Sequence, residues 1–310
     1  SWWIKSHRPT LHNTRLFISP AISARHATEY GTYDSSWGLD VNIQKPLWKG
    51  ATADVAYVQA LGHSQEFKPG EIFSPWRIDN MTHRVMLHQV KDFPYGFSAH
   101  VAYGRLSRVL EGWHQDYRWS SPQGLHRISY ERSHFEHREV NFAKDFEMWS
   151  YRYWLDRTQT ALEIKKGQYW HGDQGGMLIA RQWFGDFSAA LFLRRTRFPV
   201  GSPAAFSEYY GNVWVNSAGI EFSFPLTPRR EYQSDWIQPR GTDRLSYGSQ
   251  TVVAAKNGAN YTAPWYGIYS PVPLSLGGSI HDFDRNSQAY LMSNLHRIRQ
   301  AWSVFVEEKN

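Results

Sequence analysis

Histidine, carboxylate and serine side chains are the groups that could do chemistry in this chain, which has no cysteine and 14 histidines. Without cysteine, thiolate metal sites and cysteine nucleophiles are excluded together. The run His134-Phe135-Glu136-His137 contains residue types that bind metals, but its spacing fits no common zinc motif and we expect it in a loop. We therefore predict no metal site and no cofactor.

A serine–histidine pair is the second candidate for chemistry. Ser98 and His100 are two residues apart and are predicted to share the inward face of one strand. Any barrel rich in serine and histidine offers such a pair by chance, and the sequence shows no third member. No nucleophile elbow, phosphate-binding glycine loop, HExxH or EF-hand pattern occurs. We expect no enzyme, and we keep an outer-membrane enzyme acting on lipid A or polysaccharide as an alternative.

A larger set of charged and polar residues falls on one predicted face of successive strands. Charges of both signs inside a barrel are costly unless they are paired or solvated. They can form a cross-strand network that fills a narrow lumen, or they can line a wet channel suited to carbohydrate hydroxyls; both interpretations stay open. The predicted lumen-lining residues are Asp40, Asp54, Arg84, His88, His100, Asp116, Arg118, Arg152, Glu163 and Arg194, together with Asn42, Gln44, His114 and Lys165.

Alternation of apolar and polar residues predicts the strands that carry these side chains. It is clearest over residues 37–44, 97–104 and 187–194, and period 2 is the strand signal. Gly, Pro and Asp then predict short turns near 48–50, 92–96, 122–124, 157–159 and 184–186. Between them lie connections near 62–76, 107–112, 134–145, 171–175 and 199–212, most of which are longer. Short turns at one end and long loops at the other are typical of outer-membrane barrels.

We count about twelve strands over residues 15–226, several of them long enough to cross a bilayer when tilted. The fold class is therefore an all-β, antiparallel, transmembrane outer-membrane β-barrel spanning residues 1–226, with a soluble β-sandwich as the rival. An even count places both barrel ends on the periplasmic side. The last strand is predicted at 213–226, and its Phe222-Ser223-Phe224 ending resembles an outer-membrane assembly signal.

Residues 227–310 are predicted to form an irregular periplasmic or lumenal tail that ends in a short helix over about 284–306. The tail begins with a segment rich in Pro, Gly, Arg and Ser. The helix is indicated by apolar residues at steps of three and four. It either covers the barrel mouth, packs on a neighbour or contacts a periplasmic partner. Its apolar face comprises Leu291, Leu295, Ile298, Trp302 and Phe305.

The charge and hydropathy of the chain exclude two other classes. The net charge is +6, but the basic residues are scattered, so we expect no nucleic-acid partner. No run of about 18 apolar residues occurs, so no transmembrane helix is predicted. Aromatic residues near predicted strand ends, such as Trp37, Tyr57 and Trp149, suit interfacial girdles.

An ordered set of short motifs resembles the YjbH/GfcD family. The motifs include Pro46-Leu47-Trp48-Lys49-Gly50-Ala51, Ser74-Pro75-Trp76-Arg77-Ile78, Trp119-Ser120-Ser121-Pro122-Gln123-Gly124 and Gly219-Ile220-Glu221-Phe222-Ser223-Phe224-Pro225-Leu226. The resemblance covers roughly residues 15–240. Family members are commonly longer and often carry a lipidated N-terminal cysteine. This chain has neither feature, so we expect a piece of a longer or split protein, with a second chain as a candidate to complete the barrel.

The resemblance implies a bacterial, Gram-negative outer-membrane barrel that takes part in export or assembly of an exopolysaccharide or capsule. The implied partners are the polysaccharide, periplasmic or outer-membrane export proteins and outer-membrane lipid. Under the conduit interpretation, Arg84, Arg118 and Arg194 attract an acidic polymer. A plugged structural anchor and a general porin are the alternatives.

Overall fold

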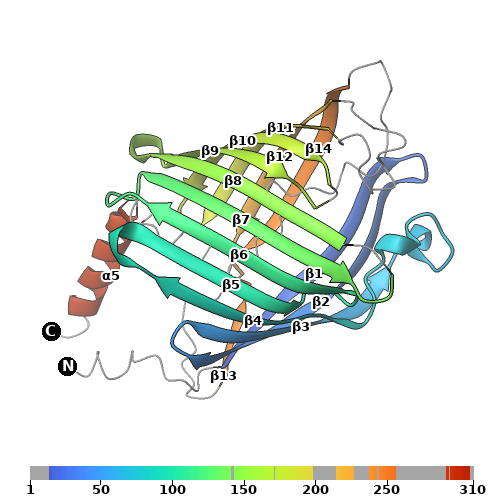
Figure 1. Ribbon diagram of the computed structural model, residues 1–310, viewed down its shortest axis with the longest axis horizontal. Helices are drawn as coiled ribbons and strands as arrows, with labels where there is room; N and C mark the ends of the chain where they lie inside the picture. The colour runs from blue at the N-terminus through green and yellow to red at the C-terminus, as the bar shows by residue number, and fades with distance from the viewer. Residues whose placement is uncertain are drawn as a thin grey trace.

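The structure is a computed structural model that describes residues 14–140, 143–170, 172–197, 214–226, 237–242, 244–255, 291–292 and 294–307. Its strands form one sheet that curls into a nearly closed barrel (Figure 1). The predicted all-β barrel is confirmed. No helix in these ranges is long and apolar enough to cross a membrane.

Twelve consecutive antiparallel strands make most of the barrel wall, which confirms the predicted count. Each of these strands pairs with the next along the chain. The strands are β1 (Thr14–Thr28), β2 (Gly31–Trp48), β3 (Ala51–His63), β4 (Met81–Asp92), β5 (Phe97–Arg105), β6 (Leu110–Ser120), β7 (His126–His137), β8 (Ala143–Leu155), β9 (Thr160–Gln168), β10 (Gln174–Phe184), β11 (Phe187–Arg197) and β12 (Val215–Phe224).

Two further strands close the barrel, and the predicted boundary at residue 226 is wrong for this reason. β13 (Ile237–Gly241) pairs in parallel with the start of β1, and β14 (Leu245–Ala255) pairs antiparallel with β12. Since residues 242–244 alone separate them, this one stretch of chain bridges the first and twelfth strands. The predicted even number of strands therefore leaves out the stretch that closes the barrel. The barrel wall continues beyond Phe224, where β12 ends.

The sequence signal for this closing strand was weak. Pro239 stands in β13, where it faces Leu16 of β1, and proline argues against a central strand. The pairing of β1 with β13 extends only from Thr14 to Ile18. A parallel pair of this length depends on the rest of the barrel to bring its two edges together.

The turns at one end of the barrel, here called the short-turn end, are those expected from the sequence. They lie between β2 and β3, β4 and β5, β6 and β7, β8 and β9, and β10 and β11, as predicted. Gly50 shows why the residue type matters: its φ is +79°, and a Cβ there would lie 2.1 Å from the carbonyl oxygen of Val90. Only glycine suits such a position.

The connections at the opposite end are less uniform than predicted. The β3–β4 connection is long and contains the short 3₁₀ turns η1 (Gln65–Phe67) and η2 (Ser74–Trp76). The predicted loops near 107–112, 134–145 and 171–175 are short, because the alternation of inward and outward residues continues further along β6, β7 and β10. The predicted loop at 199–212 lies outside the described residues.

The helix α5 (Leu295–Glu307) lies near the end of the chain. It overlaps the predicted span of about 284–306, and Leu291 and Met292 before it are also helical. Residues 284–290 lie outside the described residues. Arg297 makes a two-point ion pair with Asp186 in the β10–β11 turn, with N–O distances of 3.1 and 3.0 Å. This contact holds α5 at the short-turn end, where Figure 1 shows it beside the barrel.

Candidate functional site

The lumen is the candidate site, because every predicted lumen-lining residue faces inward. Inward residues along each strand alternate with outward ones, as the pleat requires. Asp54, His88, His100, Asp116, Arg152 and Arg194 are buried, and Asp40, Arg84, Arg118 and Glu163 are partly buried. These ten residues therefore lie on the inward faces of their strands.

Most of these charges are paired, either within one strand or with a strand one or two positions away in the sheet. Asp40 lies 3.2 Å from Nε2 of His83, and Asp116 accepts from Nε and Nη2 of Arg118, each at 2.8 Å to its Oδ2. Glu163 lies within salt-bridge distance of Arg127 (3.3 Å) and Lys165 (3.5 Å). Arg152 stands directly opposite Glu163 in the β8–β9 register. The pairing supports a cross-strand network and offsets the positive charge of Arg84, Arg118 and Arg194.

One side of the lumen carries a chain of buried polar groups that we call the polar wall: Asp54, His88, His100, His114 and Asp116. They come from β3, β4, β5 and β6. Asp54 accepts from Asn42 at 2.5 Å, forms an ion pair with Arg84 (3.0 Å) and lies 3.3 Å from Nε2 of His88. Nδ1 of His88 lies 3.0 Å from Nε2 of His100, and the two rings stack. The His100 ring in turn lies 5.4 Å from that of His114.

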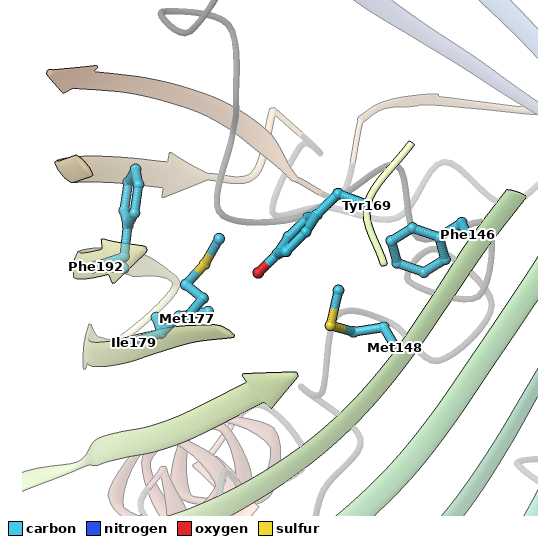
Figure 2. Close-up of a cluster of buried hydrophobic side chains, with 7 residues drawn as sticks. Phe146, Met148, Tyr169, Met177, Ile179 and Phe192 are labelled. Carbon is cyan, nitrogen blue, oxygen red and sulfur yellow. The ribbon is translucent and has the colours of Figure 1, made fainter. Parts of the chain in front are cut away.

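The other side of the lumen is apolar near the end of the barrel opposite the short-turn end. We call it the apolar wall, and it comprises Phe146, Met148, Met177, Ile179, Ala190 and Phe192, with Tyr169. Figure 2 shows Tyr169 among these side chains, with its hydroxyl directed between Met148 and Met177. Because Tyr169 belongs to the β9–β10 connection, that connection folds inward. Burial raises the pKa of Tyr169 to about 12, so its phenol stays neutral.

Trp170 extends this inward connection across the barrel. Its ring stacks on Phe146 with centroids 5.2 Å apart and lies 5.8 Å from Phe135. It packs against the apolar wall and also against a second cluster of Met86, Ala102 and Phe135. The connection therefore narrows the lumen between two faces of the barrel.

A buried ion pair fixes the base of this connection. Asp173 binds Arg194 of β11, and the side chains are 1% and 2% exposed. The Arg194 guanidinium also lies over the Tyr169 ring, 4.0 Å from its centroid. Arg194 is thus occupied by a structural role, which weakens the expectation that it attracts a polymer.

A second buried cluster joins the closing strand to the wall. Glu221 of β12 is fully buried and binds Arg181 of β10 at 2.8 Å and Arg244, which lies just before β14. Ser188 and Ser223 are hydrogen-bonded beside it, with oxygens 2.6 Å apart. This cluster stabilises the edge at which the barrel closes.

Several of these residues were missed from the sequence. Arg127, Glu131 and Glu221 lie on the inward alternation of β7 and β12, so the period-2 signal could have found them. Asp173 and Tyr169 lie in a connection and carry no such signal. His134, considered above as part of a loop run, lies in β7 on the outward face and pairs with Asp145 at 2.7 Å and Glu136 at 3.3 Å.

Ser98 and His100 do share the inward face of β5, as predicted. The hydrogen bond of His100 through Nε2 goes to His88.

Comparisons of this chain with protein-family models, with curated proteins and with solved structures give no match. The geometry of the barrel and the chemistry of its two faces are therefore the basis for inferring a function.

Proposed function

We propose that this chain is an outer-membrane β-barrel that takes part in export or assembly of an extracellular polysaccharide, without being an enzyme. The observation that carries the proposal is the opposition of the two barrel faces. The inward face holds paired charges and hydroxyls, whereas the outward face exposes large apolar residues on successive strands. Examples are Ile22, Trp37, Leu61, Tyr103, Trp149, Ile164, Leu178, Leu191 and Leu193.

The outward apolar face supports a membrane location. Leu191 and Leu193 are 63% and 59% exposed, and such residues recur around the barrel. Soluble proteins rarely expose a continuous apolar surface of this kind, because water contact with it is unfavourable. A bilayer removes that cost, and the hydrogen-bonded barrel leaves few backbone groups to desolvate.

The polar inward face supports contact with a hydroxyl-rich polymer. Arg84 and Arg118 are the two partly exposed arginines of the predicted set, and each shares its charge with a carboxylate. Mixed donors and acceptors of this kind suit sugar hydroxyls better than they suit a strongly acidic chain. The narrowing at Trp170 indicates a lumen that is constricted at rest.

An anchoring role is the second candidate, and α5 favours it. Trp302 is 64% exposed and Val306 is 39% exposed, although both are apolar. The Arg297–Asp186 ion pair presents this helix at the short-turn end. That end would face the periplasm, so the helix would be available to an export protein there.

The test replaces Arg84 and Arg118 together with glutamine in the full chain and measures polysaccharide at the cell surface. Reduced export with normal barrel assembly is expected for the conduit. A matched control replaces Arg157, which lies in the β8–β9 turn, and should leave export unchanged. Recovery of the wild-type chain outside the outer-membrane fraction would overturn the proposed location. The anchoring role would be favoured if the Arg84 and Arg118 double variant left export unchanged and replacement of Trp302 abolished it.

A further inference from the structure

We infer that His100, His114 and Asp116 form a binding site for a divalent transition-metal ion in the wall of the lumen. One candidate ligand atom from each residue lies within 4.8 Å of the other two. The three residues sit on neighbouring strands: His100 of β5 is directly opposite Asp116 of β6, and His114 lies two residues before Asp116. All three side chains are buried on the same face of the sheet.

His100 is oriented by a chain of contacts through His88. Nε2 of His88 lies 3.3 Å from the Asp54 carboxylate, and Nδ1 of His88 lies 3.0 Å from Nε2 of His100. An imidazole ring that is held through Nε2 can bind a metal ion through Nδ1.

Each of the other two candidate ligands has an orienting partner as well. Nδ1 of His114 lies 2.7 Å from the Ser133 hydroxyl, so a proton on Nδ1 leaves the lone pair on Nε2. Asp116 is held by Arg118, whose Nε donates to both carboxylate oxygens. Metal ligands in proteins are usually positioned by second partners of this type.

The ligand set selects the class of ion. Two imidazoles and one carboxylate suit zinc, cobalt, nickel or copper better than calcium or magnesium, which prefer oxygen ligands. Bonds of about 2.0–2.2 Å would draw the three atoms closer together than they stand here. Three protein ligands leave one coordination position for water or a polar group in the lumen.

The His134-Phe135-Glu136-His137 run does not provide this site. His134 and Glu136 face outward, whereas Phe135 faces the lumen. The inferred site arises because sheet pairing places β5 beside β6, and it is independent of the proposed role in polysaccharide export. His134, with its carboxylate partners Asp145 and Glu136, serves as the matched control for binding by histidine in general.

The test uses the untagged full chain, refolded in detergent with Co²⁺ or Zn²⁺ present and compared with a chelator-treated sample. We expect one tightly bound equivalent by elemental analysis, and a visible absorption band of tetrahedral or five-coordinate Co²⁺. H100A and H114A should each lose that equivalent, and H88A should weaken binding about 10- to 100-fold through the loss of orientation. H134A should bind like the wild type.

Heat-dependent mobility on gels and far-ultraviolet circular dichroism establish that each variant forms the barrel. Asp116→Asn gives a second test with little change in volume, and it should also lose the metal. The inference is overturned if the folded wild-type chain binds no equivalent, or if H100A, H114A and D116N all keep the equivalent while H134A loses it.

Discussion

The polar wall and the apolar wall of the lumen stabilise their inward-facing side chains in different ways. Both line the inside of one barrel, and both are built from inward residues at period 2. The polar wall satisfies buried charges through neighbours on adjacent strands, such as Asp54 with Arg84 and His88. The apolar wall instead recruits a connection, and Tyr169 and Trp170 fold inward to cover it. The lumen is therefore ready for polar ligands on one side and closed by packing on the other.

Removing Trp170 should give the largest change, because it links the apolar wall to the cluster of Met86, Ala102 and Phe135. We expect W170A to lower the free energy of unfolding by about 3–5 kcal/mol. We also expect a higher single-channel conductance in planar bilayers, since the narrowing is lost. The control is W149A, because Trp149 faces outward and is exposed. Equal conductance of W170A and the wild type would mean that this connection does not obstruct the lumen.

Replacing Asp173 should cause the next largest loss of stability, because Arg194 would stay buried without the carboxylate of Asp173. Breaking a buried ion pair typically costs about 3–5 kcal/mol. We expect D173N to show this loss in urea unfolding of the barrel in detergent. The partly exposed Asp186–Arg297 pair gives the control, and D186N should change stability by less than about 1 kcal/mol. Similar losses in the two variants would contradict the difference in burial.

The equivalent change in the polar wall should cost less. D54N removes the charge that Arg84 and His88 share, but Arg84 is 22% exposed and can be solvated from the lumen. We expect a loss of about 1–3 kcal/mol in the same urea experiment. D40N, at a more exposed pair with His83, should cost less still. If D54N proved more damaging than D173N, the polar wall would be the more tightly packed of the two.

Alkaline pH should have the smallest effect, and it should act on the apolar wall through Tyr169. Because the pKa of Tyr169 is raised to about 12 from its ordinary value of 10, the folded barrel holds this proton more tightly than the unfolded chain. The resulting stability is fully present below pH 10 and is lost as the pH rises towards 12. Tyrosinate absorbance should therefore be equal in the wild type and Y169F at pH 10.5. A larger wild-type signal at that pH would show that Tyr169 is solvated.

Much of the barrel could be predicted from local pattern. Alternation along β2, β5 and β11 indicated strands and assigned inward residues such as Asp40 and His100 to the correct face. Period 2 is a property of the extended backbone, so it can be read without knowing which strands pair. The five short turns were predictable for a similar reason, since glycine at positions such as Gly50 reflects a local backbone requirement.

The closing strand, the inward connection and the ion pairs could not be predicted in this way. β14 pairs with β12 although its sequence has weak alternation, because the curled sheet presents a free edge to it. Asp173 pairs with Arg194 only because Tyr169, Trp170 and Asp173 of the β9–β10 connection lie on the inward side of the barrel. His100 and His114 come together because β5 lies beside β6. Composition and periodicity therefore decide strand, face and turn, which depend on neighbours in the chain. Barrel closure, charge pairing and the inferred metal site depend on which distant segments share an edge or a lumen, and only the tertiary structure sets that.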